Sequence, residues 1–251
     1  MNNSPIAAES VTQVDHKVFR GAIAYTSKKT KRMDQERGRE FYTITVHSEG
    51  SRTIVVHTEI DDRPCVMRDA TYSLNPDWIP TDCFVRLSVA DKFMGTGWFR
   101  FTPTYAECET FTAIEGRITQ RFELSAPMKS FQNHAIACDS WHFRHYDISK
   151  GPGQQRIEPF LLCSPDHRGA TGPMLYPIGL NMVYVGDEEV TVRAGSFAAH
   201  HFQFPGSTEL PEEHPPYDIW TTADGEFNFL KGGVEGYMQT WYELVEFEQV
   251  V

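Results

Sequence analysis

The residues of this chain that could do chemistry are concentrated between Asn133 and Asp147, in the sequence NHAIACDSWHFRHYD. His142, His145 and Tyr146 lie close together there, and Asp139 comes just before them. A histidine titrates near neutral pH, and burial beside a carboxylate or a tyrosine can adapt it to proton transfer. We therefore predict general acid–base catalysis by His142, His145, Tyr146 and Asp139.

A second pair of candidates, His200 and His201, lies in the sequence VYVGDEEVTVRAGSFAAHHFQF, from Val183 to Phe204. This sequence predicts a strand, a turn, a second strand in which Val190 and Val192 alternate with polar residues, a tight Ala194-Gly195 corner, and a third strand that carries the two histidines. Neighbouring residues of a strand point to opposite sides of a sheet, so only one of the two histidines can face a given pocket. We predict a catalytic role for His201 and a binding role for His200, and which of them faces the cavity stays open.

Other side chains are predicted to bind the substrate. The planar guanidinium of Arg144 could hold a carboxylate or a phenolate. The predicted substrate-binding residues, several of them chosen from strand parity, are Trp98, Trp141, Arg144, Tyr184, Arg193, His200 and Gln203. The alternative is that Trp141 and Phe143 belong to the core and that their polar neighbours cover an exposed face.

Other kinds of site find less support in the sequence. It has no GxSxG motif and no CxxC pair, and Gly95-Thr96-Gly97 is followed by a predicted strand instead of a phosphate-binding helix. His142 and His145 have an HxxH spacing that could form a metal site with a later histidine, but this spacing is common. We predict no metal and no cofactor.

Short segments in which apolar and polar residues alternate must position these candidate residues. Phe41–His47 and Thr53–Ile60 alternate on either side of a turn, and further short segments of this kind follow. The pattern predicts an all-β protein, either an antiparallel β-barrel or a barrel-like sandwich of lipocalin or calycin type, built from a long meander with few short helices. Residues 133–147 fit a strand or a helix. Residues 164–173 and 205–216 are predicted to be loops, and residues 28–39 a solvated loop or a short helical turn rather than a binding patch.

The domain organisation predicted from the sequence is simple. Residues 1–16 are polar and without period, which predicts a flexible leader. Residues 17–251 are long enough for one β-barrel domain, with a possible seam between two halves near residues 125–130.

The last third of the chain resembles a family of bacterial antiparallel β-proteins classed as a domain of unknown function. The family shows a hairpin of the type GxE-V-x-V-x-AG-x-F, then an aspartate-x-tryptophan strand, a turn and a closing strand. The matching residues here are Gly186, Glu188 or Glu189, Val190, Val192, Ala194, Gly195, Phe197, Asp218, Trp220, Asp224, Gly225, Tyr242, Glu243 and Leu244. Over residues 180–247, the resemblance implies a curved, barrel-like sheet and brings no catalytic residues with it.

The composition limits the partners. A net charge of -11 over 251 residues, without a basic stripe, argues against nucleic acid as a partner. The start MNNSPIAAESVTQVD has neither the positive charge nor the apolar run of an export signal, and no window is apolar enough for a membrane span. We expect a cytoplasmic protein that does not bind membranes, has reduced cysteines and could form a homodimer through its terminal strand.

These observations together predict a function. Aromatic residues combined with a His/Tyr/Asp/Arg group predict a lyase, isomerase or hydratase that needs no cofactor and acts on a hydrophobic or aromatic small molecule in the barrel. The alternative is a non-catalytic carrier or sensor with the same cavity. Convergent ionisable side chains would favour the enzyme, and a purely apolar lumen would favour the carrier.

Overall fold

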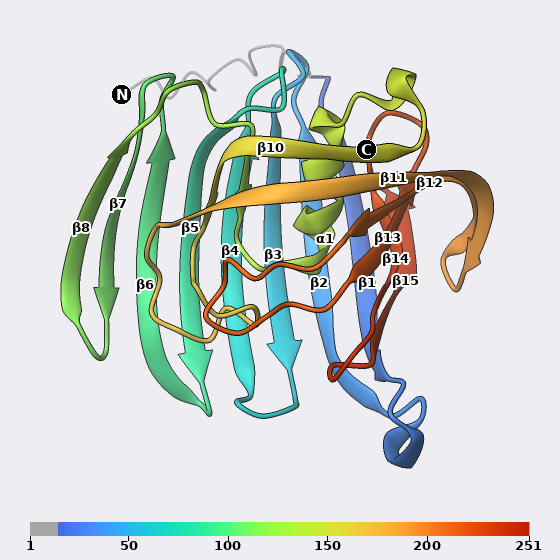
Figure 1. Ribbon diagram of the computed structural model, residues 1–251, viewed down its shortest axis with the longest axis horizontal. Helices are drawn as coiled ribbons and strands as arrows, with labels where there is room; N and C mark the ends of the chain where they lie inside the picture. Colours follow the sequence, from blue (N-terminus) through green and yellow to red (C-terminus); the bar gives the residue numbers. More distant parts are fainter. Residues whose placement is uncertain (1–14, 251) are drawn as a thin grey trace, which may run out of the picture.

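Alternation of apolar and polar residues gives most strands one buried and one exposed face. In the strand that runs from Arg52 to Ile60, Ile54 and Val56 are buried, whereas Val55 between them is exposed. The computed structural model describes residues 15–250, in which fifteen strands form one curved sheet (Figure 1).

The strands are β1 (Lys17–Ser27), β2 (Glu36–Val46), β3 (Arg52–Ile60), β4 (Val66–Leu74), β5 (Pro80–Val89), β6 (Lys92–Phe101), β7 (Tyr105–Thr112), β8 (Gly116–Glu123), β9 (Ser130–Gln132), β10 (Gly153–Leu162), β11 (Tyr176–Val192), β12 (Gly195–Phe204), β13 (Tyr217–Thr222), β14 (Phe229–Val234) and β15 (Thr240–Gln249). The helical segments are α1 (Ile136–Asp139) and the 3-10 turns η1 (Thr30–Arg32), η2 (Ser140–His145) and η3 (Ile148–Lys150).

The sheet follows the chain as a meander whose two ends meet in the middle. Its strand order is β8-β7-β6-β5-β4-β3-β2-β1-β15-β14-β13-β12-β11-β10-β9. All neighbours pair antiparallel except β9 and β10, which are parallel. The all-β, antiparallel, barrel-like fold is therefore confirmed, but β8 and β9 remain as free edges and the barrel is not closed.

The curvature of the sheet places a short helical segment inside the molecule. Figure 1 shows β10 and β11 crossing in front of the strands β2 to β6, with α1 behind them. α1 packs against both β2 and β14. The segment 133–147, for which the sequence allowed a strand or a helix, is thus mainly helical, as α1 followed by η2.

A buried carboxylate on β2 fixes this segment. Glu40 accepts hydrogen bonds from the backbone amides of Ile136 (3.0 Å) and Ala137 (2.8 Å), and from the hydroxyls of Tyr25 (2.9 Å) and Thr58 (2.8 Å). Burial raises the pKa of Glu40, although these four bonds act in the opposite direction. Glu40 therefore joins the start of α1 to the strands β1, β2 and β3.

A buried arginine on β4 fixes the connection between β10 and β11. The Arg68 guanidinium donates to the carbonyls of His134 (2.7 Å), Arg168 (2.6 Å) and Gly169 (3.1 Å). The sequence predicted residues 164–173 to be a loop, and the structure shows that this loop is tied to the interior.

The predicted leader and the predicted seam fall in different parts of the structure. Residues 1–14 of the predicted leader lie outside the described residues. The predicted seam near residues 125–130 falls in the connection from β8 to β9, which links the two edges of the sheet. Among residues 15–250, none of the helical segments is both long and apolar enough to cross a bilayer.

Candidate functional site

A cavity of about 130 Å³ lies between the α1–η2 segment and the strands β10 to β15. Its walls are mainly aliphatic and aromatic, with contributions from Phe160, Leu162, Ile178, Leu180, Phe204 and Val234. Its polar lining includes Asp139, His142, His167, His214 and Tyr217. We call this space the inner cavity.

His142 presents an unpaired ring nitrogen in this lining. Its Nδ1 hydrogen-bonds with the hydroxyl of Ser130, and its Nε2 is buried without a hydrogen-bond partner among the described residues. Burial lowers the pKa of His142 to about 3, so the ring is neutral at pH 7. If the Ser130 hydroxyl donates to Nδ1, the ring proton lies on Nε2, which can donate to a ligand. If the hydroxyl accepts from Nδ1, Nε2 can accept from a ligand.

Asp139 and Tyr217 lie together in the same lining. Burial raises the pKa of Asp139 to about 7, although the Gln132 amide donates to its carboxylate at 2.7 Å. Burial and then the charge of Asp139 raise the pKa of Tyr217 well above its usual value. The Tyr217 hydroxyl is buried and has no well-formed hydrogen bond in the described part of the chain, although it lies close enough to the Asp139 carboxyl for each group to shift the pKa of the other.

Three more histidines lie at the cavity, and all three have a pKa lowered first by burial. His134 Nε2 bonds to the Ser164 carbonyl at 3.2 Å, and the pKa of His134 is about 3. His214 Nδ1 bonds to the Pro215 carbonyl at 2.6 Å. The Nδ1 atom of His167 is buried and forms no hydrogen bond within residues 15–250, but it lies 3.6 Å from a carboxylate oxygen of Glu212.

The unpartnered atoms are concentrated at this one place. Among the described residues, four buried side-chain nitrogen or oxygen atoms have no hydrogen-bond partner, and three of them belong to His142, His167 and Tyr217 of the inner cavity. Most buried polar groups in proteins are hydrogen-bonded. Three of these four exceptions therefore belong to residues that line one cavity.

A second cavity, of about 590 Å³, adjoins the inner cavity, and we call it the mouth. It lies where the β1–β2, β3–β4, β10–β11 and β14–β15 connections meet. The residues that line both cavities are His134, Ile136, His167, Met238 and Tyr242. Side chains thus form the wall between the two spaces.

One group at the mouth has the composition of a metal site. The ligand atoms of Asp166, His167 and Glu212 lie within 4.8 Å of one another. The guanidinium of Arg168, however, lies 3.0 Å from Asp166 and 3.6 Å from Glu212. The positive charge of Arg168 thus already faces both carboxylates, and a metal cation there would compete with it.

Several of the residues predicted from the sequence lie elsewhere in the interior. His145 and Trp141 contact Trp78, His145 through a bond of 3.2 Å from Nε2 to the Trp78 carbonyl and Trp141 through an edge-to-face ring contact. Tyr146 donates to the Gly153 carbonyl at 2.8 Å. Of the four predicted catalytic residues of the 133–147 segment, the structure brings Asp139 and His142 to the inner cavity.

The two adjacent histidines of β12 point to opposite sides of the sheet, as expected. The two strands predicted between Val183 and the Ala194-Gly195 corner are instead one continuous strand, β11, with a register shift near Gly186. His200 lies on the same side as Phe202, and its Nδ1 lies 2.5 Å from Asp187, which also accepts from the Tyr184 hydroxyl. On the other side, His201 stacks on Trp220 with ring centroids 4.1 Å apart.

The other predicted binding residues lie on the surface. Gln203 donates to Asp218 at 3.2 Å, beside His201. Arg193 is exposed and lies 3.4 Å from Glu243. Arg144 and Trp98 are exposed as well.

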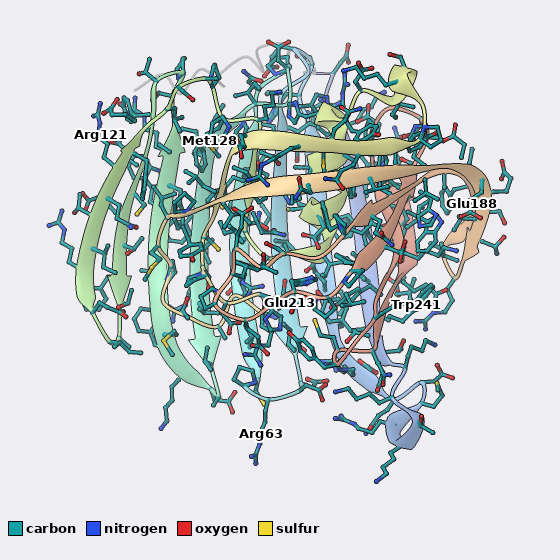
Figure 2. The ribbon with its side chains drawn as sticks, in the orientation of Figure 1. Arg63, Arg121, Met128, Glu188, Glu213 and Trp241 are labelled. Carbon is teal, nitrogen blue, oxygen red and sulfur yellow. The ribbon has the colours of Figure 1, made fainter. Side chains whose placement is uncertain are left out.

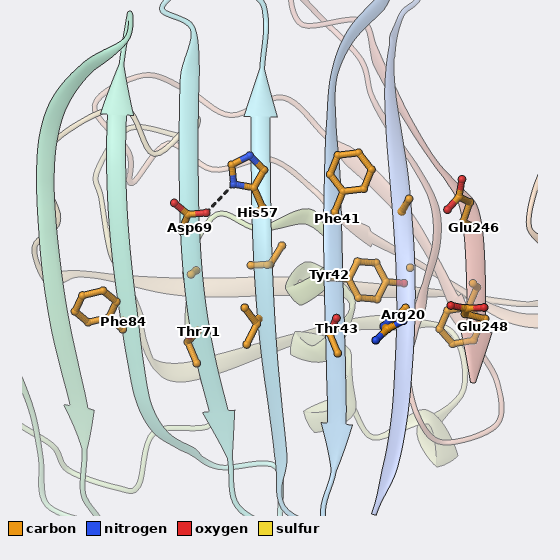
Figure 3. Close-up of a pocket in the computed structure, with 16 residues that line it drawn as sticks. Arg20, Phe41, Tyr42, Thr43, His57, Asp69, Thr71, Phe84, Glu246 and Glu248 are labelled. Atoms are coloured by element: carbon orange, nitrogen blue, oxygen red, sulfur yellow. Dashed lines mark hydrogen bonds and ion pairs between the residues drawn. The ribbon is translucent and has the colours of Figure 1, made fainter. Parts of the chain in front are cut away.

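A larger hollow of about 680 Å³ lies on the outer face of the strands β1 to β5 and β15. Figure 3 shows its His57 and Asp69 pointing toward each other, and their side chains are 2.6 Å apart. Phe41 and Phe84 of this hollow are each about half exposed (49% and 48%). Because its histidine is already paired and its aromatic rings face solvent, this hollow offers less for specific binding than the inner cavity.

Sequence reasoning missed several residues of the site, namely His134, His167, His214 and Tyr217. His134 stood within the segment that the sequence singled out. His167 and His214 come from the two long connections 164–173 and 205–216, and Figure 2 shows Glu213 of the second one on the side of β10 and β11. Two histidines in two unusually long loops were the available signal.

The chain is similar over nearly its whole length to a solved β-barrel-like protein of a domain of unknown function, DUF1849, from Brucella abortus. The TM-score is 0.59 and the sequence identity 12%, over 95% of this chain and 100% of that chain. The sequence resemblance covered the last third alone, so the structural likeness extends it to almost the entire chain. At this identity, the likeness concerns the fold and carries no function.

Two further solved structures are more distant. They are a candidate exported protein with a YmcC-like fold from Bacteroides fragilis (TM-score 0.37, 7% identity, covering 94% of this chain and 96% of that chain) and a candidate lipoprotein from Parabacteroides distasonis (TM-score 0.32, 8% identity, covering 92% and 94%). No protein-family model matches the chain, and no curated protein matches it.

Proposed function

We propose that this protein binds a small, largely apolar molecule that carries one hydrogen-bonding group. The observation that carries the proposal is the set of three buried polar atoms without a hydrogen bond, on His142, His167 and Tyr217, at a cavity whose walls are mainly aliphatic and aromatic. A buried polar atom without a partner costs about 1–3 kcal/mol. A ligand that hydrogen-bonds to these atoms recovers part of that free energy.

The size of the inner cavity supports an aromatic ring as the apolar part. A cavity of roughly 150 Å³ holds benzene, and the inner cavity measures about 130 Å³. Phenol is therefore a suitable probe, because its ring matches the space and its hydroxyl can pair with His142 Nε2 or with Tyr217.

Calorimetric titration with phenol and with benzene tests the proposal. We expect phenol to bind about tenfold more tightly than benzene, since one hydrogen bond in a buried site contributes about 1–1.5 kcal/mol. Leu180→Trp fills the cavity and should abolish binding of both. Val185→Trp, on the same strand but at an exposed position (46% exposed), is the matched control and should bind like the wild type.

Two results would argue against the proposal. The first is that neither compound binds, in which case the unpartnered atoms are satisfied by water. The second is that Leu180→Trp and Val185→Trp bind equally well, in which case the compounds bind outside the inner cavity.

A cofactor-independent acid–base enzyme, such as a lyase, isomerase or hydratase, is the second candidate. Its support is that Asp139, with a pKa of about 7, and the neutral ring of His142 line one cavity. A general acid or base works best with a pKa near the working pH. The α-protons of 4-hydroxyphenylacetone, observed by NMR in D₂O, should then exchange faster with protein than with buffer, and Asp139→Asn should remove the difference. Exchange at the buffer rate would leave binding as the function.

A further inference from the structure

The mouth differs from the inner cavity in its charge. Its lining contains five cationic side chains, Lys29, Arg32, Arg37, Arg63 and Arg168, and two carboxylates, Asp61 and Asp62. The whole chain carries a formal charge of -11. A local excess of positive charge on an acidic protein attracts anions to one place.

The partners of these charges show where the excess lies. Asp62 is shared by two arginines, because Arg37 Nε bonds to its Oδ2 and Arg32 Nη2 lies 2.8 Å from its Oδ1. In the described structure, neither Lys29 nor Arg63 forms an ion pair with a carboxylate. The unbalanced positive charge therefore lies on the side of the β1–β2 and β3–β4 connections.

The opposite side of the mouth is balanced differently. Arg168 faces the two carboxylates of Asp166 and Glu212. Figure 2 shows Arg63 extending from the end of the molecule where the β3–β4 connection lies. An anion at the mouth would thus be held near Lys29, Arg37 and Arg63, away from the acidic pair.

The wall between the two cavities can admit a bridging ligand. It consists of side chains, among them Met238, which is half-buried and belongs to the β14–β15 connection. Methionine is unbranched and adapts its shape easily. A molecule that passes Met238 would have one end in the apolar space and the other in the cationic mouth.

We propose that the ligand is an aryl carboxylic acid, with its ring in the inner cavity and its carboxylate in the mouth. The inference rests on the proposed function, to which it adds the class of ligand and a second binding subsite. Lys29 and Arg63 attract the carboxylate, and the arginine pair around Asp62 strengthens the positive field there.

The test compares 3-(4-hydroxyphenyl)propanoate and 5-(4-hydroxyphenyl)pentanoate with their methyl esters, by calorimetric titration. The two chain lengths are needed because the acid group has to reach the mouth. We expect the better of the two acids to bind the wild type about tenfold more tightly than its ester, a preference that 1 M NaCl should largely remove by screening. The double variant Lys29→Gln/Arg63→Gln should lose this preference and keep the affinity for the ester.

The matched control is Lys17→Gln/Lys92→Gln, which removes the same charge at two exposed positions that do not line the mouth. It should retain the acid preference. If phenol binds in the inner cavity but acids and esters bind equally, this inference is wrong and the proposed function stands. If phenol, acids and esters all fail to bind, both are wrong. An acid preference that the control variant also loses would mean general charge attraction and would overturn the mouth as the subsite.

Discussion

The hydroxyl of Tyr217 is a polar group that the fold buries beside the Asp139 carboxyl, without a well-formed hydrogen bond within residues 15–250. Such a group lowers the stability of the empty protein and is retained where a ligand uses it. Stability and binding should therefore respond in opposite directions when the hydroxyl is removed.

Tyr217→Phe should raise the free energy of unfolding by about 1 kcal/mol and should reduce the preference for phenol over benzene several-fold. Thr110→Val is the matched control, because Thr110 Oγ1 is also buried and unpartnered but lies outside the inner cavity. It should be stabilising and leave phenol binding unchanged. Chemical denaturation and calorimetric titration measure the two effects, and a loss of stability in Tyr217→Phe with binding intact would contradict a ligand-binding role.

Asp139 should leave a signature in the pH dependence of stability. Burial raises its pKa from 3.8 to about 7, so the folded protein holds this proton more tightly than the unfolded chain does. Its contribution to stability is fully present below pH 3.8 and is lost as the pH rises toward 7. Asp139→Asn cannot titrate there, and the contributions of the neutral histidines are common to both proteins.

The free energy of unfolding of the wild type should thus fall relative to that of Asp139→Asn, by up to about 1.4 kcal/mol per pH unit between pH 4 and 7. Urea denaturation at several pH values measures this difference. A difference that does not vary with pH would mean that the carboxyl is not buried as described.

The connection between β10 and β11 is the element on which the site most depends, because it carries His167 and is held by Arg68. Gly169 has a φ of +63°, and a Cβ there would lie 2.3 Å from Arg68 Nη2. Gly116, at the start of β8, also has a positive φ, +75°, but a Cβ there would meet nothing within 4 Å. The two glycines separate backbone strain from contact with Arg68.

Gly116→Ala should cost about 1 kcal/mol, from backbone strain alone. Gly169→Ala should cost about 1–3 kcal/mol more, because the displaced Arg68 would leave buried carbonyls without a donor. It should also weaken phenol binding. Thermal and chemical denaturation give the costs, and equal costs for the two variants would show that Arg68 does not need the close approach.

Most strands could be predicted from alternation, but the start of β2 could not. Residues 28–39 were predicted to be a solvated loop or a short helical turn, which agrees with η1, but β2 already begins at Glu36. Its charged residues fit a strand because the neighbouring strand pairs them, as Arg39 does with Glu59 of β3 and with Asp61 just past the end of β3. Cross-strand pairing of this kind depends on register, which a single sequence does not show.

Only some residues of the candidate site could be predicted from the sequence. The residue types of the 133–147 segment pointed to Asp139 and His142, and both reach the inner cavity. His145 and Tyr146 follow in sequence, but the turns of η2 carry them to other parts of the interior. His167, His214 and Tyr217 join the site only because the sheet curls, so their place depends on tertiary structure.

For the whole molecule, the arrangement of the sheet explains why the site lies where it does. β1 pairs with β2 and β15, so a continuous sheet connects the first and last strands and curls around α1. The incomplete closure leaves room for the long connections to enter. The inner cavity and the mouth lie among these connections and the later strands.

The most direct test of ligand binding in the inner cavity is a crystal structure of the protein with 4-bromophenol, located by the anomalous signal of bromine. We predict one bromine peak inside the inner cavity, with the phenol oxygen about 2.7–3.2 Å from His142 Nε2 or from the Tyr217 hydroxyl. A protein whose inner cavity holds only ordered water, with bromine solely at the outer hollow or elsewhere on the surface, would contradict the proposal.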